Sequence, residues 1–122
     1  MNALKTQQDY MRKLESSFRS QLVAYQDVLG AYRYNDTRAQ DRIKAFKNSV
    51  ALLGLKFSNC YHASGIGNNN NYTIYLEVRD SDGFVVQKNI ANFYYCYGIF
   101  GGCYASLKDL STGSQLTVGR AL

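Results

Sequence analysis

The sequence predicts an α+β fold in which two N-terminal helices pack on one face of an antiparallel β-meander of five or six strands, giving two layers. Apolar residues recur every three or four positions up to residue 53, which is the period of a helix. After Gly54 the period changes to two, which is the period of a strand. Turns rich in glycine, asparagine and serine separate the alternating segments.

Length and composition indicate one folded unit. The chain has 122 residues, of which 46% are hydrophobic and 19% charged, as in globular domains. We expect a single domain over residues 1–122, with a helical half at 1–54 and a sheet half at 55–122. No apolar run has the length of a membrane span, and the first residues lack the core of a signal peptide. We therefore expect no membrane partner and a cytoplasmic location, in the host cytoplasm if a phage encodes the chain.

The first helix is predicted over residues 6–29. Its apolar face consists of Met11, Leu14, Phe18, Leu22, Tyr25 and Leu29. A helix of this length extends about 36 Å, whereas a compact domain of this size has a radius of gyration of about 14 Å. We therefore expect the helix to overhang its own domain, and we predict a homo-oligomer formed through residues 10–29.

The second helix is predicted over residues 36–53. Asp36 is a suitable N-cap, and Gly54 suits the left-handed position that ends a helix. Its apolar face consists of Ala39, Ile43, Phe46, Val50 and Leu53. Arg38 and Arg42 flank this face, and we count them among the candidate contacts to an anionic ligand.

Six segments alternate as strands do. They are residues 55–62, 72–80, 84–91, 93–97, 103–110 and 115–119. Residues 63–71, which include four consecutive asparagines, are predicted to form a loop. Asp82-Gly83 is typical of a hairpin turn. The alternation sends Ile74 and its even-numbered neighbours to the core, so that Tyr75, Glu77 and Arg79 face outward.

The three cysteines and the single histidine supply a weak candidate metal set. Cys60, His62, Cys96 and Cys103 form a complete set of zinc ligands by residue type. Neither pair has the close spacing of a usual zinc motif, so we expect no metal and reduced thiols. A disulfide between Cys96 and Cys103, placed opposite each other across a hairpin, is the alternative.

No catalytic motif occurs in the chain. The sequence has no nucleophile elbow, no zinc-protease helix and no phosphate-binding loop. A cysteine nucleophile would depend on His62 and has no recognisable signature around it. We therefore expect a protein that is not an enzyme and has no cofactor.

Charge and tyrosine content point to an anionic ligand. The net charge is +5, there are 11 tyrosines, and residues 1–56 carry the whole positive excess. A tyrosine ring can stack on a base, and an arginine can bind a phosphate through two hydrogen bonds. We predict a ligand surface centred on Tyr75 and Arg79 of strand 72–80. It is extended by Tyr94 and by Arg33 from the connector between the helices.

These observations predict a small binding protein for an anionic ligand, either a nucleotide or nucleic acid. By analogy of size and composition with accessory proteins of phages and mobile elements, such a gene would be carried by one of them. Two alternatives stay open. One is a phage-borne inhibitor or adaptor that binds a host defence protein complex, in the manner of an anti-CRISPR protein, because tyrosines also favour protein interfaces. The other is a structural subunit of a phage particle.

Overall fold

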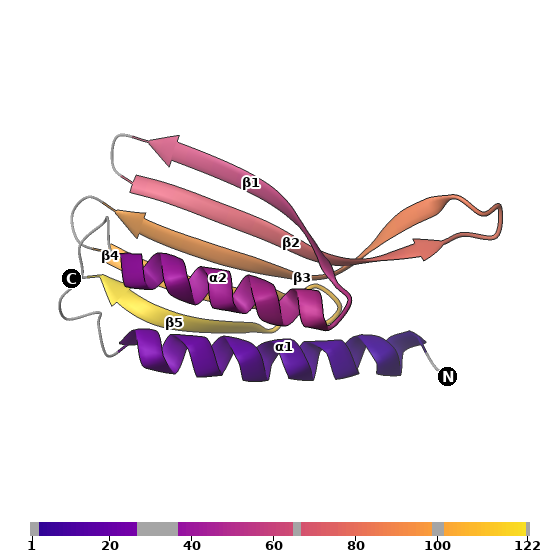
Figure 1. Cartoon of the computed structure of the whole chain (residues 1–122), viewed down its shortest axis with the longest axis horizontal. Coiled ribbons are helices and arrows are strands. Elements are labelled where there is room, and N and C mark those ends of the chain that lie inside the picture. The colour runs from indigo at the N-terminus through magenta and orange to yellow at the C-terminus, as the bar shows by residue number, and fades with distance from the viewer. Residues whose placement is uncertain (1–2, 27–36, 65–66, 99–101, 122) are drawn as a thin grey trace.

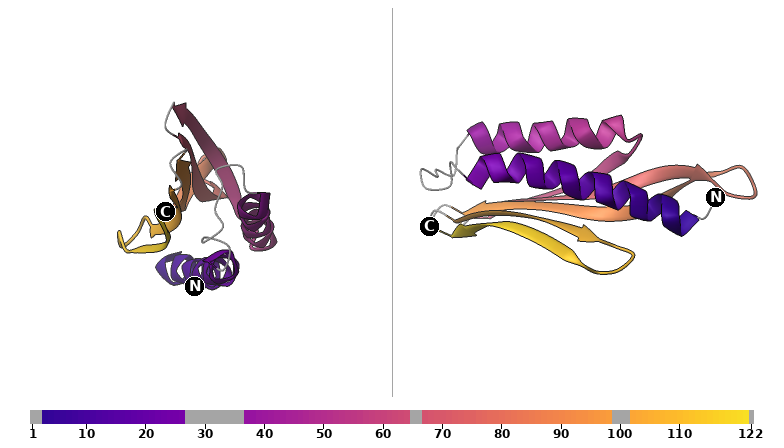
Figure 2. Two further views of the ribbon diagram at one scale, coloured as in Figure 1. Left: turned by 90° about the vertical axis from the view of Figure 1, so that its left-hand side faces the viewer. Right: turned by 90° about the horizontal axis from the view of Figure 1, so that it is seen from below.

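A computed structural model of the chain describes residues 3–26, 37–64, 67–98 and 102–121, and it has the α+β architecture. Helices α1 (Ala3–Gln26) and α2 (Thr37–Leu52) precede five strands, which are β1 (Lys56–Ser64), β2 (Gly67–Arg79), β3 (Val85–Gly98), β4 (Gly102–Asp109) and β5 (Gln115–Ala121). The strands form one antiparallel sheet in which each pairs with the next along the chain (Figure 1). Both helices lie on the same side of the sheet (Figure 2). We call the other side the open face.

The core lies between the helices and the sheet. Six of the apolar positions predicted for the helices are buried, namely Met11, Leu14 and Phe18 of α1 and Ile43, Phe46 and Val50 of α2. Leu53 is partly buried, and the side chains of Leu22, Tyr25, Leu29 and Ala39 lie outside the described part. Phe93 of β3 joins the two layers, with its ring centroid 5.5 Å from that of Phe18 and 4.5 Å from that of Phe46. The alternation predicted for residues 93–97 is confirmed where side chains are described, because Phe93 and Tyr95 are buried and Tyr94 lies on the open face.

The overhang predicted for the first helix is wrong. Leu14 and Phe18 are 0% exposed and Met11 is 4% exposed, because they pack on the sheet of their own chain. Strands β2 and β3 have 13 and 14 residues, and at about 3.3 Å per residue they extend more than about 40 Å. The sheet is therefore as long as the helix, and the estimate from a compact sphere fails. The side chains of residues 22–29 lie outside the described part, so self-association through residues 10–29 loses the observation that motivated it.

The strand boundaries differ from the prediction in two places. Residues 67–71, predicted as loop, begin β2 and pair with β1 on one side and β3 on the other. Main-chain pairing on both edges outweighs the low strand propensity of asparagine. Residues 84–91 and 93–97, predicted as two strands, form the single strand β3. Its register with β2 shifts at Ile74 and Tyr75, where Ile90 is an extra residue in a β-bulge.

The hairpin of β2 and β3 projects beyond the rest of the sheet. The pairing of β1 with β2 ends at Tyr75, and that of β4 with β3 ends at Ala91. Residues 76–89, which we call the arm, therefore pair only with each other within the described chain. Figure 1 shows the arm extending past both helices. The predicted turn at Asp82-Gly83 forms the tip of the arm, where Gly83 has a φ of 85°. The Asp80 carboxylate accepts hydrogen bonds from the backbone N–H groups of Asp82 and Phe84, each at 2.9 Å.

Candidate functional site

The open face carries polar side chains brought together from four strands. Six of them line a shallow depression with a volume of about 230 Å³, and they are Asn71 of β2, Asn92 and Tyr94 of β3, Ser106 and Lys108 of β4, and Gln115 of β5. Strand register explains this grouping, because Tyr94 pairs with both Asn71 and Ser106. Lys108 likewise pairs with both Asn92 and Gln115. The depression thus consists of two neighbouring rows across the sheet.

The aromatic ring and the cation of this depression are diagonal neighbours. Tyr94 of β3 lies opposite Ser106 of β4. Ser106 comes two residues before Lys108 on β4, so Lys108 is the diagonal neighbour of Tyr94. Diagonal side chains on adjacent strands have Cβ atoms roughly 7–8 Å apart. A single group with a flat ring and a charged substituent can therefore contact both Tyr94 and Lys108.

A hydrogen bond orients one amide at the edge of the depression. The Thr73 hydroxyl donates to Oδ1 of Asn92 at 3.1 Å. The carbonyl end of Asn92 is thereby engaged by its neighbour on β2, and its amide nitrogen has two N–H groups to donate. Asn71 and Gln115 add further amide groups. The depression can therefore both donate and accept hydrogen bonds at the edge of a planar ligand.

Lys108 is a cation of the open face that forms no ion pair with the described residues. Lys56, on β1, forms an ion pair with Glu77 at 2.7 Å. The hydrogen bond that the Lys56 ammonium donates to Glu77 raises the pKa of Lys56 above its ordinary value, and the negative charge of Glu77 adds to this effect. Lys108 is exposed and has no acidic partner among the described residues. A negatively charged ligand group would meet an uncompensated positive charge there.

The structure places Tyr75 and Arg79, the predicted centre of the site, away from this depression. Tyr75 is half-buried on the open face, opposite Lys56 and Asn89. Arg79 belongs to the arm, where its guanidinium donates to the carbonyl of Gly83 at 2.7 Å. Of the predicted site residues, Tyr94 is the one that lines the depression. Tyr75 is four residues along β2 from Asn71, which corresponds to about 13 Å.

Arg42 is the one arginine predicted in the helical half whose side chain is described, and it lies on the side of the sheet opposite Tyr75 and Tyr94. Arg42 is half-buried on α2, which packs against the opposite face of the sheet. Arg38 belongs to the first turn of α2, and its side chain lies outside the described part. Arg33 lies in the undescribed connector. The binding role assigned to all six residues from the sequence stays a prediction.

The cysteines do not have the arrangement that the disulfide alternative requires. Cys60 is exposed, Cys96 is half-buried, and both are free thiols. Cys96 lies opposite Tyr104, and Cys103 lies opposite Tyr97, so the predicted direct pairing across the hairpin is wrong. The side chains of His62 and Cys103 lie outside the described part. Among the side chains that are described, no three His, Cys, Asp or Glu residues gather as metal ligands would.

Sequence reasoning missed five of the six residues that line the depression. Asn71, Asn92, Ser106, Lys108 and Gln115 carry no motif, and each looks like an ordinary polar position of a strand. What these five residues share in the sequence is their position in the alternating pattern, which places each of them on the outward side of its strand. Which of them become neighbours depends on register between strands, and the bulge at Ile90 shifts that register.

Comparisons with known proteins add no relative to this description. No protein-family model matches the sequence, and no curated protein or solved structure matches it either. Neither helix is both long and apolar enough, over the residues described, to cross a membrane.

Proposed function

We propose that this protein binds single-stranded nucleic acid on the open face of its sheet, with one nucleotide held in the depression around Tyr94. The observation that supports the proposal is the diagonal placement of Tyr94 and Lys108, surrounded by the amides of Asn71, Asn92 and Gln115. Reaction chemistry is not part of the proposal, because the described depression holds no carboxylate, imidazole or thiol.

Each group in the depression has a role toward a nucleotide. The Tyr94 ring stacks on a base, an interaction that contributes roughly 1–3 kcal/mol and tolerates any base. The Lys108 ammonium binds a phosphate oxygen, and the asparagine and glutamine amides donate to and accept from base edges. An antiparallel sheet with helices on its far side leaves these groups on a broad, accessible surface.

The shape of the site favours a strand over a free nucleotide. Sites for small ligands bury about 70–90% of the ligand surface, whereas this depression is a shallow dish of about 230 Å³. A strand gains the rest of its affinity from neighbouring nucleotides along the face. Tyr75, about 13 Å from Asn71 along β2, lies within reach of such a strand. The net charge of +5 attracts a polyanion toward any part of the molecule.

Fluorescence anisotropy tests the proposal with a labelled oligonucleotide of mixed sequence, about 20 nucleotides long, as a single strand and as a duplex. The single strand is expected to bind more tightly than the duplex. Tyr94→Ala is expected to weaken binding about tenfold or more, which corresponds to one stacked base. Lys108→Ala is expected to reduce the slope of log affinity against log salt by about 0.7, which corresponds to one phosphate contact on a single strand.

Tyr61→Ala is the matched control, because Tyr61 is 56% exposed on β1 and lies on the helix-facing side of the sheet by register with Asn70. It is expected to bind like the wild type. Tyr75→Ala and Arg79→Ala separate this site from the centre predicted from sequence. If these two variants lose binding while Tyr94→Ala and Lys108→Ala retain it, the ligand lies over Tyr75 and Arg79, and the site proposed here is wrong. Equal binding of all variants, or of the duplex, contradicts the proposal itself.

A further inference from the structure

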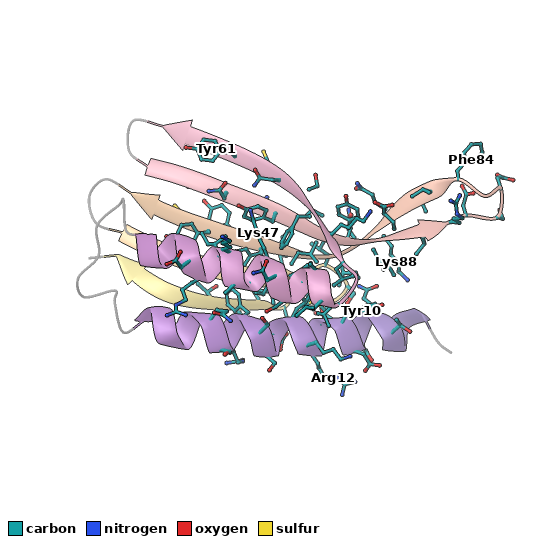
Figure 3. All side chains as sticks on the ribbon, viewed as in Figure 1. Tyr10, Arg12, Lys47, Tyr61, Phe84 and Lys88 are labelled. Atoms are coloured by element: carbon teal, nitrogen blue, oxygen red, sulfur yellow. The ribbon has the colours of Figure 1, made fainter. Side chains whose placement is uncertain are left out.

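The tip of the arm exposes apolar side chains on a projecting segment. Phe84 is 70% exposed, Val85 52% and Val86 41%. Phe84 lies beyond the ends of both helices in Figure 3, at the outermost part of the molecule. Large apolar side chains that gather on a projecting hairpin are a feature of interaction surfaces.

An apolar pocket lies at the other end of the same arm. Its volume is about 220 Å³, and it is formed where the first turns of α1 approach the arm. It is lined by Thr6, Gln7, Tyr10, Leu76, Val78, Lys88 and Ile90. Figure 3 shows Lys88 and Tyr10 where the arm leaves the sheet. The pocket has room for an aromatic side chain, and aromatic rings are the usual anchors of protein interfaces.

The tip and the pocket also have complementary charges. Lys88 is half-buried at the pocket and forms no ion pair with the described residues. At the tip, the Asp80 carboxylate is engaged by backbone N–H groups and Arg79 by the Gly83 carbonyl. Asp82 is exposed, and no described cation pairs with it. Asp82 and Phe84 therefore present a carboxylate and a ring at the tip, and a mainly apolar pocket with one lysine at its edge can accept both.

We infer that the arm pairs with the arm of a second copy of this chain, with Phe84 of each copy in the pocket of the other and Asp82 on Lys88. The two parts are about 20 Å apart along β3, from Phe84 to Ile90. A two-fold axis across the middle of the arms brings each tip to the opposite base at the same time. Both pockets are then filled, and the pair closes without leaving a tip to bind a third copy. This inference is independent of nucleic-acid binding, because the arm shares no residue with the depression around Tyr94.

The small contact area sets the expected affinity. A stable interface buries about 800 Å² on each partner, and a hairpin arm offers less than that. The dimer is therefore expected to dissociate on dilution and to form in the high micromolar range. Sedimentation velocity from about 5 µM to about 1 mM covers this range.

The wild type is expected to change from monomer to dimer over that range. Phe84→Ser is expected to weaken the dimer more than about tenfold. Tyr61→Ser is the matched control, because Tyr61 is also an exposed aromatic and lies at the opposite end of the sheet. It is expected to dimerise like the wild type. Phe84 is exposed, so its loss leaves the core intact, and circular dichroism confirms this for each variant.

Charge reversal tests which groups meet. Asp82→Lys places two lysines together at each contact, and Lys88→Glu places two carboxylates together, so each variant alone is expected to be monomeric. Mixed in equal amounts, the two variants restore an opposite-charge pair at both contacts, and a mixed dimer is expected. A wild type that stays monomeric up to about 1 mM overturns the inference, and the arm would then not be a contact between copies of this chain. A dimer that persists in Phe84→Ser also overturns it, as does a mixture that stays monomeric.

Discussion

Phe93 connects both helices to the sheet, so its replacement measures how the two layers are held together. Its side chain is 2% exposed. Its ring contacts those of Phe18 and Phe46, and it lies in a stacked arrangement 6.1 Å from that of Tyr72. Truncation of a buried phenylalanine to alanine costs about 3–5 kcal/mol, because apolar contacts are lost and a cavity remains. With aromatic rings on three sides, we expect Phe93→Ala to cost about 4 kcal/mol.

Phe93→Leu separates packing from ring geometry. Leucine keeps most of the buried apolar surface, whereas the edge-on contact with Phe18 and the close contact with Phe46 are lost. Each aromatic pair contributes about 0.5–1.5 kcal/mol beyond its buried area, so we expect a cost of about 1–2 kcal/mol. Urea unfolding followed by circular dichroism measures both variants, with the slope against urea concentration expected to stay unchanged.

Phe84→Ala is the control for this series, since Phe84 is 70% exposed and its truncation is expected to change the free energy of unfolding of the monomer by less than about 0.5 kcal/mol. The measurement is made well below the concentration at which the arms are expected to pair. If Phe93→Ala costs no more than Phe84→Ala, the helices are not held on the sheet through Phe93. The arrangement of the two layers described above would then be wrong.

Two further predictions concern turns. Burial alone would raise the pKa of Asp109, but hydrogen bonds from the Ser111 hydroxyl at 2.6 Å and backbone N–H at 2.8 Å, together with Thr112, outweigh it and hold the pKa below 3.8. The ionised form therefore stabilises the fold above the unfolded pKa of about 3.9, and this contribution is lost as pH falls through the folded value. Asp109→Asn should reduce the free energy of unfolding by about 1–2 kcal/mol at neutral pH. Below the folded pKa of Asp109 the variant and the wild type should be equally stable. A stability difference that does not change with pH in urea unfolding contradicts this role of the ionised Asp109. The Cβ atom added by Gly83→Ala would have no atom within 4 Å, so the expected cost of about 1–2 kcal/mol comes from the left-handed backbone alone. Amide hydrogen exchange should accelerate in the arm and not in α1. Unchanged exchange in the arm would show that the left-handed turn at Gly83 does not hold the arm together.

The elements of the fold follow from the sequence to within a few residues. The stripe of Leu14 and Phe18 and that of Ile43 and Phe46 predict two helices with one buried face each, and the structure has both. The change of period after Gly54 and the turn at Asp82-Gly83 predict the meander. These patterns are local, since a helical or strand period is a property of one segment and its immediate neighbours.

Of the site residues predicted from sequence, Tyr94 lines the depression, and its neighbours there differ from the predicted ones. Alternation places Tyr75, Arg79 and Tyr94 correctly on the outward side of their strands. It does not reveal that Arg79 lies in an arm beyond the sheet, or that Lys108 lies diagonal to Tyr94. The neighbours of a strand residue are set by the register with other strands, and one bulged residue changes every pairing beyond it.

The sequence by itself therefore determined both helices, most of each strand and which side of each enters the core, because burial of apolar side chains follows the local period. Only the tertiary structure decided that the Asn68–Asn71 segment is a paired strand, that the first helix covers a sheet as long as itself, and that residues 76–89 project as an arm. Each of these depends on pairing between segments far apart in the chain. Main-chain hydrogen bonds are the same for every residue except proline, so they leave no mark in the sequence that would identify the partner strand or its register.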